Sequence, residues 1–296
     1  MQLIFLGTSA MVPTKDRNHS AILLRYQNEG IMFDCGEGTQ RQLKHAGIKP
    51  TQITKIVISH WDGDHVLGLP GLIQTLAMAE ENKHLMIFGP KGTKKRFEHL
   101  FKAFEFYNQI DLEIVEFENG TFLKTDEYMI NSYLLEHKVP CYGFEFIEKD
   151  KRRIKVSAIK KLGIPDGPLL GKLQQGKTVT HKGKEISAKD TTYIVEGKKI
   201  GFISDTRICT NCKVIAKDKD IVICDSTFAK KDDDKAHDYF HMTTQQAASV
   251  AADSNAKKLI LTHFSQRYKD VKDLEEEAQD IFPNTVAAFD FMKIKI

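Results

Sequence analysis

Four side chains of metal-binding type lie within six residues of one another, directly after a short run of β-branched residues. The run 56–58 favours a buried strand, and it ends in His60, Asp62, Asp64 and His65. Glycine at position 63 permits a tight turn, so these side chains are expected to converge. Aspartates beside a buried strand are costly unless a cation lies among them. The spacing therefore predicts a site for a pair of divalent ions, with a solvated polar turn as the alternative.

Three further candidate ligands each come directly after a predicted strand. They are His137 after 128–136, Asp205 after 200–204 and His263 after 258–262. One such residue alone is more often a capping or surface residue, but four strand ends of this kind in one chain predict a shared site. Asp34 and Glu37 also follow a strand, where they suit either the first turn of a helix or a site.

The composition is that of an ordinary globular protein. Hydrophobic residues make up 41% of the 296 residues and charged residues 28%. The N-terminal segment lacks a basic region and reads as a first strand, which argues against a signal peptide. No apolar run reaches the length of a membrane span. These features predict a cytoplasmic protein without a membrane partner.

The five cysteines are odd in number and scattered, which favours reduced thiols over a disulfide framework. Cys209 and Cys212 form a single C-x-x-C pair. Without a second pair this is a weak indication of a zinc site, and we interpret the two thiols as structural.

Positive charge is concentrated in one segment. Between Glu148 and Glu185 there are eleven Lys and Arg against four Asp and Glu, whereas the remainder holds 32 basic and 36 acidic residues. The segment 148–188 is also rich in Gly and Pro, which suits an extended arm with a short helix and no core. Such an arm fits a polyanion, or is simply a solvated insertion.

Strands alternate with helices in both halves of the chain, which predicts an α/β protein, and the similar organisation of the halves fits a four-layer αββα sandwich. The expected strands are 1–6, 21–25, 31–34, 55–58, 84–88, 112–117, 128–136, 142–147, 191–195, 200–204, 221–224, 258–262 and 287–294. The expected helices are 39–44, 69–79, 91–107, 243–252 and 271–281.

From residue 6 to the last strand, the chain resembles the ribonuclease Z family of tRNA 3′-processing endonucleases in the metallo-β-lactamase superfamily. The resemblance rests on Phe33–Gln40, His60–Gly71, His137 with Pro140 and Gly143, the arm, Ser204–Arg207, His241–Thr244 and Leu261–Tyr268. It implies a single metallo-β-lactamase domain over 1–296, with 148–188 as an inserted tRNA-binding exosite.

The resemblance also implies residue roles. One ion is expected on His60, Asp62 and His137, and the second on Asp64, His65 and His263, with Asp205 bridging them. Asp64 is expected to be the catalytic base, and Asp225 with His241 to help protonate the leaving oxygen. In the arm, substrate contacts are expected from Lys151, Arg152, Arg153, Lys172 and Lys177.

Two positions depart from the family pattern. Asp62 stands where the family normally has His, and Asp225 where it usually has Glu. The resemblance implies two zinc ions, but a carboxylate favours harder cations, so Asp62 points towards manganese or iron.

The implied function is two-metal hydrolysis that removes the 3′ trailer from precursor tRNA, by a homodimer. One alternative is a small-substrate hydrolase on the same scaffold: a phosphodiesterase, thioesterase or lactonase. The arm and the His241 segment argue against it, because a small substrate needs neither. A second alternative is a metal-depleted RNA-binding relic, suggested by Asp62 alone.

Overall fold

A computed structural model describes residues 1–79, 84–105 and 110–296. The chain divides into two compact units. We call Met1–Leu123, Ile130–Phe146 and Lys199–Ile296 the main unit, and Lys124–Met129 with Ile147–Lys198 the arm unit. In the described part of the chain, no helix has the length and apolar character that a membrane span requires.

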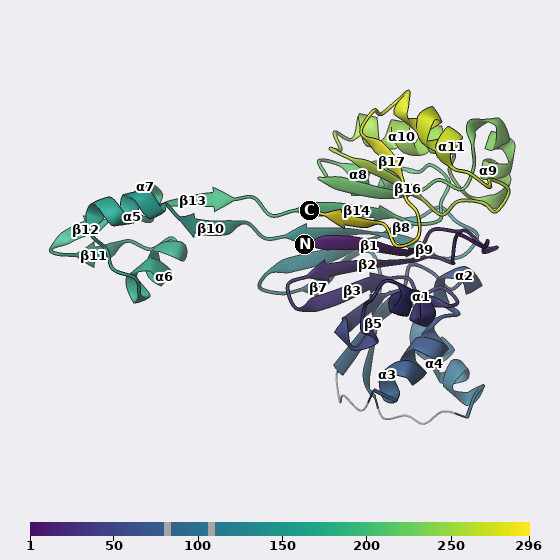
Figure 1. The fold of residues 1–296 in the computed structure, drawn as a ribbon, viewed down its shortest axis with the longest axis horizontal. Helices are drawn as coiled ribbons and strands as arrows, with labels where there is room; N and C mark the ends of the chain where they lie inside the picture. Colours follow the sequence, from purple (N-terminus) through teal and green to yellow (C-terminus); the bar gives the residue numbers. More distant parts are fainter. Residues whose placement is uncertain (80–83, 106–109) are drawn as a thin grey trace. The chain divides into compact units, whose positions relative to one another are not determined.

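Two seven-stranded sheets form the centre of the main unit (Figure 1). The strands of the first are β1 (Gln2–Gly7), β2 (Ala21–Tyr26), β3 (Glu29–Phe33), β4 (Ile53–Val57), β5 (His84–Pro90), β6 (Asp111–Phe117) and β18 (Lys293–Lys295). Their order is β18-β1-β2-β3-β4-β5-β6. Strands β3 to β6 are parallel, whereas β18, β1, β2 and β3 pair antiparallel.

The second sheet has the order β17-β16-β15-β14-β9-β8-β7. Its strands are β7 (Gly120–Lys124), β8 (Tyr128–Leu135), β9 (Cys141–Glu148), β14 (Lys199–Ile203), β15 (Ile221–Asp225), β16 (Leu259–Thr262) and β17 (Thr285–Ala287). Strands β14 to β17 are parallel. Because the carboxyl ends of parallel strands meet at one edge, residues that follow them gather there.

Helices cover the outer face of each sheet (Figure 1). Beside the first sheet are α1 (Thr39–His45), α2 (Gly63–Val66), α3 (Leu69–Ala77) and α4 (Thr93–Lys102); beside the second are α8 (Thr210–Ala216), α9 (Asp233–Tyr239), α10 (Thr244–Asp253) and α11 (Lys272–Gln279). Two 3₁₀ turns span Pro50–Gln52 and Lys230–Asp232. Between the sheets the rings of Phe33 and Phe202 stack with centroids 3.8 Å apart. The predicted αββα sandwich is confirmed.

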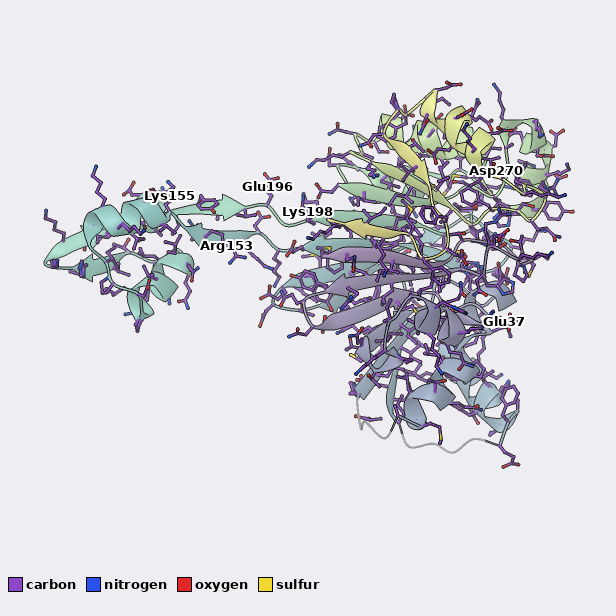
Figure 2. The ribbon with its side chains drawn as sticks, viewed as in Figure 1. Glu37, Arg153, Lys155, Glu196, Lys198 and Asp270 are labelled. Atoms are coloured by element: carbon purple, nitrogen blue, oxygen red, sulfur yellow. The ribbon has the colours of Figure 1, made fainter. Side chains whose placement is uncertain are left out.

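The arm unit has a small core of its own, so the prediction of an arm without a core was wrong. Its elements are β10 (Lys151–Ile154), α5 (Val156–Leu162), α6 (Pro168–Gln174), β11 (Val179–His181), β12 (Lys184–Ile186), α7 (Ala188–Thr191) and β13 (Thr192–Val195). Ile159, Leu173 and Val179 are buried together in it. Because these few apolar residues are separated by Lys, Gly and Pro, the composition of the segment does not indicate a core. Figure 2 shows the charged side chains of the unit, including Arg153 and Lys155.

Three sequence expectations need correction. The strand expected at 191–195 pairs with β10 inside the arm unit, not with the main sheets. The last strand, expected at 287–294, is two strands in different sheets, β17 and β18. The helix expected at 91–107 is shorter, because α4 ends at Lys102; Tyr107 lies outside the described residues. Strand β7 and helices α8 and α9 were not predicted.

Candidate metal centre

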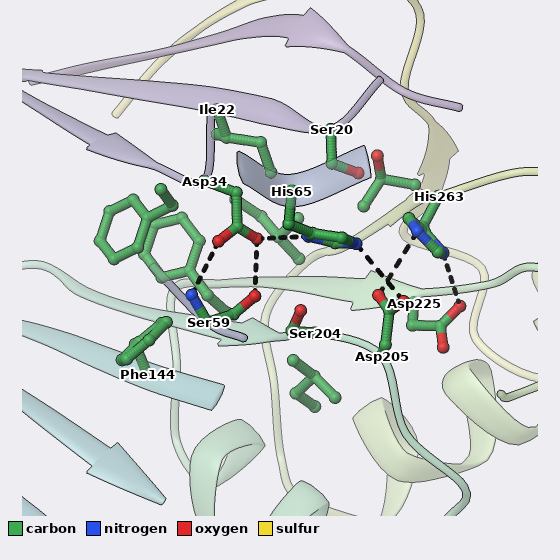
Figure 3. A pocket seen from close by; sticks show the side chains of 15 residues that line it. Ser20, Ile22, Asp34, Ser59, His65, Phe144, Ser204, Asp205, Asp225 and His263 are labelled. Atoms are coloured by element: carbon green, nitrogen blue, oxygen red, sulfur yellow. Dashed lines mark hydrogen bonds and ion pairs between the residues drawn. The ribbon is translucent and has the colours of Figure 1, made fainter. Parts of the chain in front are cut away.

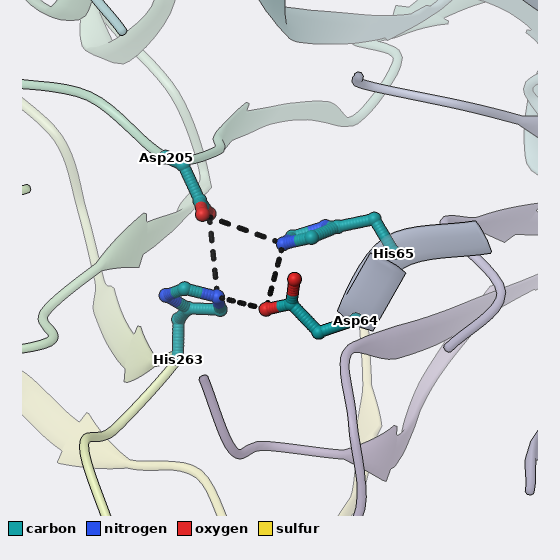
Figure 4. Close-up of side chains that lie close together, drawn as sticks. All are labelled: Asp64, His65, Asp205 and His263. Carbon is teal, nitrogen blue, oxygen red and sulfur yellow. Dashed lines mark hydrogen bonds and ion pairs between the residues drawn. The ribbon is translucent and has the colours of Figure 1, made fainter. Parts of the chain in front are cut away.

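Asp64 and His65 of helix α2 face Asp205 and His263, which follow strands β14 and β16 of the second sheet (Figure 4). The Nε2 of His65 lies 3.4 Å from Asp64 Oδ2 and 3.4 Å from Asp205 Oδ2. The Nε2 of His263 lies 3.3 Å from Asp64 Oδ2 and 3.4 Å from Asp205 Oδ1. A tetrahedral ion with bonds of about 2.0–2.2 Å sets its ligand atoms roughly 3.3–3.6 Å apart. The four side chains therefore have the spacing of one ion's ligands.

A second group consists of His60, Asp62 and His137. Asp62 Oδ2 lies 3.7 Å from His60 Nε2 and 3.4 Å from His137 Nε2. Asp205 Oδ2 also lies 3.7 Å from His60 Nε2, so this carboxylate is within reach of both groups. The arrangement has room for two ions that share Asp205.

Hydrogen bonds fix the ring of His65 (Figure 3) and that of His60. Asp34 Oδ2 accepts from Nδ1 of His65 at 2.7 Å and from the Ser59 hydroxyl at 2.8 Å. Because that hydroxyl gives its proton to Asp34, it accepts from Nδ1 of His60 at 2.9 Å. Both rings thus carry a proton on Nδ1 and present Nε2 to the site, as supporting residues do around metal-bound histidines.

His137 and His263 are held in the same way from the second sheet. The carbonyl of Phe240 accepts from Nδ1 of His137 at 3.1 Å. The Thr227 hydroxyl donates to Asp225, so it accepts from Nδ1 of His263 at 2.9 Å. All four candidate imidazole ligands therefore expose the same nitrogen.

Backbone strain collects around these residues. Asp34, Phe240 and His263 have φ of 58°, 64° and 64°, a left-handed backbone conformation that residues other than glycine adopt uncommonly. Such positions cost on the order of 1–3 kcal/mol each and persist where the surroundings enforce them. At these three residues the left-handed backbone directs the Asp34 carboxylate, the Phe240 carbonyl and the His263 imidazole towards the site.

The glycines that the motif requires are Gly36 and Gly68, not Gly63. A Cβ on Gly68 would lie 2.0 Å from the Gly36 carbonyl oxygen, and one on Gly36 would lie 2.4 Å from the Asp64 carbonyl oxygen. These glycines let the loop after β3 contact the metal-binding motif directly. Gly63 instead begins the four-residue helix α2 with no positive φ, so the convergence of the neighbouring side chains does not depend on a left-handed glycine at this position.

Several buried polar atoms lack a partner among the described residues. Nε2 of His60, Nε2 of His65 and Oδ1 of Asp64 are buried without a hydrogen bond. Buried polar groups of this kind are costly unless something binds them. Nitrogen and carboxylate donors that converge at ligand spacing fit divalent metal ions, and the site is a divalent-metal site by this test.

Without a bound cation, the negative charge of the site's carboxylates is balanced by protons on neighbouring imidazoles. Burial alone would raise the pKa of Asp205, but the imidazoles of His263 and His65 hold it well below its usual value. Burial would lower the pKa of His263, yet Asp205 raises it to about 10. Burial and the nearby His65 lower the pKa of His60 to about 4.

Metal loading is therefore expected to release protons. His263 holds its proton at neutral pH in the metal-free protein, because its pKa is about 10, and it must lose that proton to become a ligand. Apparent affinity for zinc or manganese should rise from pH 6 to pH 8. Calorimetric titration in two buffers of different ionisation enthalpy measures the release; equal binding heats in both would contradict the expectation.

Asp225 and His241 form a pair beside the ligand groups. His241 Nδ1 donates to Asp225 Oδ2 at 2.9 Å. Asp225 also accepts from the backbone amides of Thr206 and Thr227, so its oxygens are already occupied and it suits a positioning role better than a ligand role. Burial would raise its pKa, but His241 lowers it to about 2.

A cleft of about 510 Å³ opens over the two ligand groups. Its walls contain aromatic and basic side chains besides the candidate ligands: Lys138, Phe228, Tyr239 and Arg267. Phe228 and Tyr239 stack with centroids 6.3 Å apart, and the ammonium of Lys138 lies 5.1 Å from the Tyr239 ring centroid. Aromatic faces next to cations suit unstacked bases and phosphates.

Full-length comparison gives the family. The chain is 39% identical to ribonuclease Z of Bacillus subtilis (strain 168) over 304 aligned positions, which cover 100% of this chain and 99% of the relative. This chain belongs to the ribonuclease Z family. Human tRNase Z, short form, has a similar structure, with a TM-score of 0.71 and 27% identity over 100% of this chain and 99% of that one.

Two other similarities are more restricted. The metallo-β-lactamase fold protein YhfI from Bacillus subtilis matches with a TM-score of 0.73 over 99% of this chain and 98% of that one, at 16% identity, which shows the fold alone. A family model described as anti-Pycsar protein Apyc1 matches residues 1–137. That range ends at His137 and excludes Asp205, His263 and the arm unit, so the full-length match to ribonuclease Z is the more informative one.

The main supporting residues were not assigned from sequence. Asp34 was noticed but given no role, and Ser59, Thr227 and the Phe240 carbonyl were not considered. Ser59 stands next to His60 and Asp34 directly follows β3, whereas Thr227 and Phe240 adjoin no predicted ligand. The side chain of His237, four residues before His241, is exposed next to Asp238 and takes no part in the site.

The five basic residues predicted to contact the substrate differ in exposure and in the interactions that they already make. Arg153, Lys172 and Lys177 are exposed. Lys151 instead pairs with Glu148 at 2.9 Å, and Arg152 donates to Thr192 at 2.9 Å. Part of the positive charge of β10 therefore serves the unit's own structure.

Replacing Asp62 with His should shift metal preference towards zinc, because an imidazole suits zinc better than a carboxylate does. Asp62 Oδ2 already lies 3.4 Å from His137 Nε2, so an imidazole at position 62 would complete a ligand group with His60 and His137. Metal content after equilibration with zinc and manganese together measures the preference. Asp270→His, in an exposed loop, is the control; an unchanged zinc-to-manganese ratio in Asp62→His would exclude Asp62 as a ligand.

Proposed function

We propose that this protein removes the 3′ trailer from precursor tRNA by endonucleolytic hydrolysis of a phosphodiester. The observation that carries the proposal is the convergence of His60, His65, His137 and His263 on shared carboxylates, in a chain that aligns with ribonuclease Z along its full length. Two divalent ions at such a site supply a nucleophile from water at neutral pH and neutralise charge on the phosphate oxygens.

The ligand roles proposed from the family follow the two groups of side chains. His60, Asp62 and His137 hold one ion, and Asp64, His65 and His263 hold the other, with Asp205 between them. Asp64 directs Oδ2 towards both imidazoles and leaves Oδ1 without a hydrogen bond among the described residues, so it can accept a proton as the catalytic base.

His241 is suited to protonate the leaving oxygen. Its Nδ1 is held by Asp225, which leaves Nε2 without a hydrogen bond to the described residues, and the side chain lines the cleft beside Asp64 and Asp205. The aromatic pair Phe228 and Tyr239 in the same cleft offers a stacking surface for bases next to the scissile phosphate.

The exposed cations of the arm unit are proposed to bind the tRNA body through its phosphates. Arg153, Lys172 and Lys177 are the residues of the predicted set whose side chains are exposed. We further propose that the protein acts as a homodimer in the cytoplasm, which sedimentation of the purified protein and fractionation of cells would test.

Incubation of the purified protein with a trailer-bearing precursor tRNA tests the function directly. Zinc, manganese and iron(II) are added in turn to metal-stripped protein. We expect one cut near the 3′ end of the tRNA in at least one metal. Hydrolysis of a small phosphodiester without any cleavage of the precursor would favour the small-substrate hydrolase instead.

His241→Ala is expected to lower kcat by about 10²–10⁴, the usual contribution of an acid–base group, without changing the metal content. Single-turnover cleavage and elemental analysis provide the two readouts. His237→Ala is a matched control, since His237 lies four residues earlier in the chain and its side chain is exposed. Loss of an ion in His241→Ala would show that this residue is a ligand and would overturn its role in proton transfer.

A further inference from the structure

Two thiols at the beginning of helix α8 lie unusually close together. The Sγ atoms of Cys209 and Cys212 are 3.6 Å apart, which is van der Waals contact. The backbone amide of Cys212 donates to the carbonyl of Cys209 at 3.1 Å, so the intervening residues form a single turn. A disulfide needs an S–S distance of about 2.05 Å, so the two sulfurs must come closer by about 1.5 Å for the bond to form.

The two thiols are chemically unequal. Cys209 is partly exposed, whereas Cys212 is buried. The hydrogen bond from Cys212 lowers the pKa of Cys209 to about 5, and the same interaction raises the pKa of Cys212. A partly exposed thiolate beside a protonated partner is the arrangement of a reactive thiol pair.

The other three cysteines provide an internal contrast. Cys35, Cys141 and Cys224 are fully buried. Burial raises the pKa of Cys35 to about 12 and keeps those of Cys141 and Cys224 well above the usual value. Structural thiols of this kind are inert. The sequence analysis interpreted Cys209 and Cys212 as structural, but their contact and the partial exposure of Cys209 distinguish them from these three buried thiols.

We propose that Cys209 and Cys212 form a redox-active dithiol that reacts with low-molecular-weight disulfides. The Cys209 thiolate attacks one sulfur of the small disulfide, which forms a mixed disulfide and releases one small thiolate. Cys212 then loses its proton to that thiolate or to water and attacks the Cys209 sulfur, which releases the second small thiol. Overall, two protein thiols are oxidised to a disulfide and the small disulfide is reduced to two thiols.

The second step is favoured by the first. The hydrogen bond to Cys209 is the largest cause of the raised pKa of Cys212. In the mixed disulfide the Cys209 sulfur carries no negative charge, so this cause disappears and Cys212 becomes a better nucleophile. The dithiol is defined by its own contacts and does not depend on the proposed tRNA reaction.

The pair belongs to the segment that follows Asp205. Cys209 Sγ lies 3.9 Å from the Thr206 hydroxyl, and the Thr206 amide donates to Asp225 at 3.3 Å. Reaction with a small disulfide therefore takes place next to the candidate metal centre but uses none of its ligands.

Selective alkylation tests the reactivity of the metal-loaded, full-length protein. At pH 6, iodoacetamide should label Cys209 at least tenfold faster than Cys35, Cys141 or Cys224, as followed by peptide mass spectrometry. Glutathione disulfide should then convert the unlabelled protein into a form that lacks two hydrogens, with a peptide cross-link between Cys209 and Cys212.

Two variants distinguish the steps. Cys212→Ser should stop at the mixed disulfide and retain one glutathione on residue 209, whereas Cys209→Ser should take up none. Thermal melting verifies that each variant folds. Equal alkylation rates for Cys209 and the three buried cysteines in the unsubstituted protein, or a failure of the 209–212 cross-link to form, would overturn the proposal.

Discussion

Asp205→Asn is expected to lower kcat/KM for precursor tRNA by about 10³ or more and to lower metal occupancy. Asp205 lies 3.4 Å from Nε2 of both His65 and His263 and 3.7 Å from Nε2 of His60, so it serves both ligand groups. An amide keeps the shape but loses the negative charge. A loss of about 4 kcal/mol in transition-state stabilisation, a modest part of what metal ions supply, corresponds to a thousandfold in rate.

Cleavage kinetics and elemental analysis of the same preparation check this expectation. Asp253→Asn removes a surface carboxylate paired with Lys213 and should change neither quantity. Should Asp205→Asn retain two ions and more than a tenth of the activity, Asp205 does not bridge the ligand groups.

Removing the exposed cations of the arm unit is expected to weaken precursor binding by about tenfold to a hundredfold while leaving hydrolysis of a small phosphodiester unchanged. The triple variant Arg153→Ala, Lys172→Ala, Lys177→Ala removes three phosphate-binding charges. The slope of log affinity against log salt should become shallower by about 0.7 for each phosphate that the variant no longer neutralises. The matched control removes three exposed lysines beside the first sheet: Lys91, Lys94 and Lys95.

Deleting the arm unit sharpens the same test. The amide of Glu148 donates to the carbonyl of Lys198 at 2.9 Å, so the two ends of the segment are adjacent and a two-glycine linker can replace residues 149–197. The small core of Ile159, Leu173 and Val179 leaves with the segment, so the cores of the main unit stay intact. Undiminished tRNA binding after the deletion would exclude the arm unit as the exosite.

The convergence of these side chains could be predicted from sequence because their positions obey one simple rule. His60, Asp205 and His263 each come just after a strand, and strand ends meet at one edge of the sheets. The spacing of apolar residues and the content of β-branched residues are enough to predict such strands. The resemblance to ribonuclease Z then supplied the roles, which remain proposals for the individual residues.

Sequence failed where the decisive contacts join distant residues. Asp34 holds His65 from another strand, and the Phe240 carbonyl holds His137 across 103 positions of the chain. Neither contact leaves a local pattern. The strained φ of Phe240 has no sequence signature either, since glycine, asparagine or aspartate is more usual at such positions. The arm unit's core was missed because it is small and lies among many charges.

Anomalous scattering from crystals of the metal-loaded protein tests the central claim most directly. Data collected on either side of the zinc, manganese and iron absorption edges identify each ion and its position. We predict two peaks, one among His60, Asp62 and His137 and one among Asp64, His65 and His263, with Asp205 between them. A single peak, or a peak bound by Asp225 and His241 instead, would contradict the two-ion account.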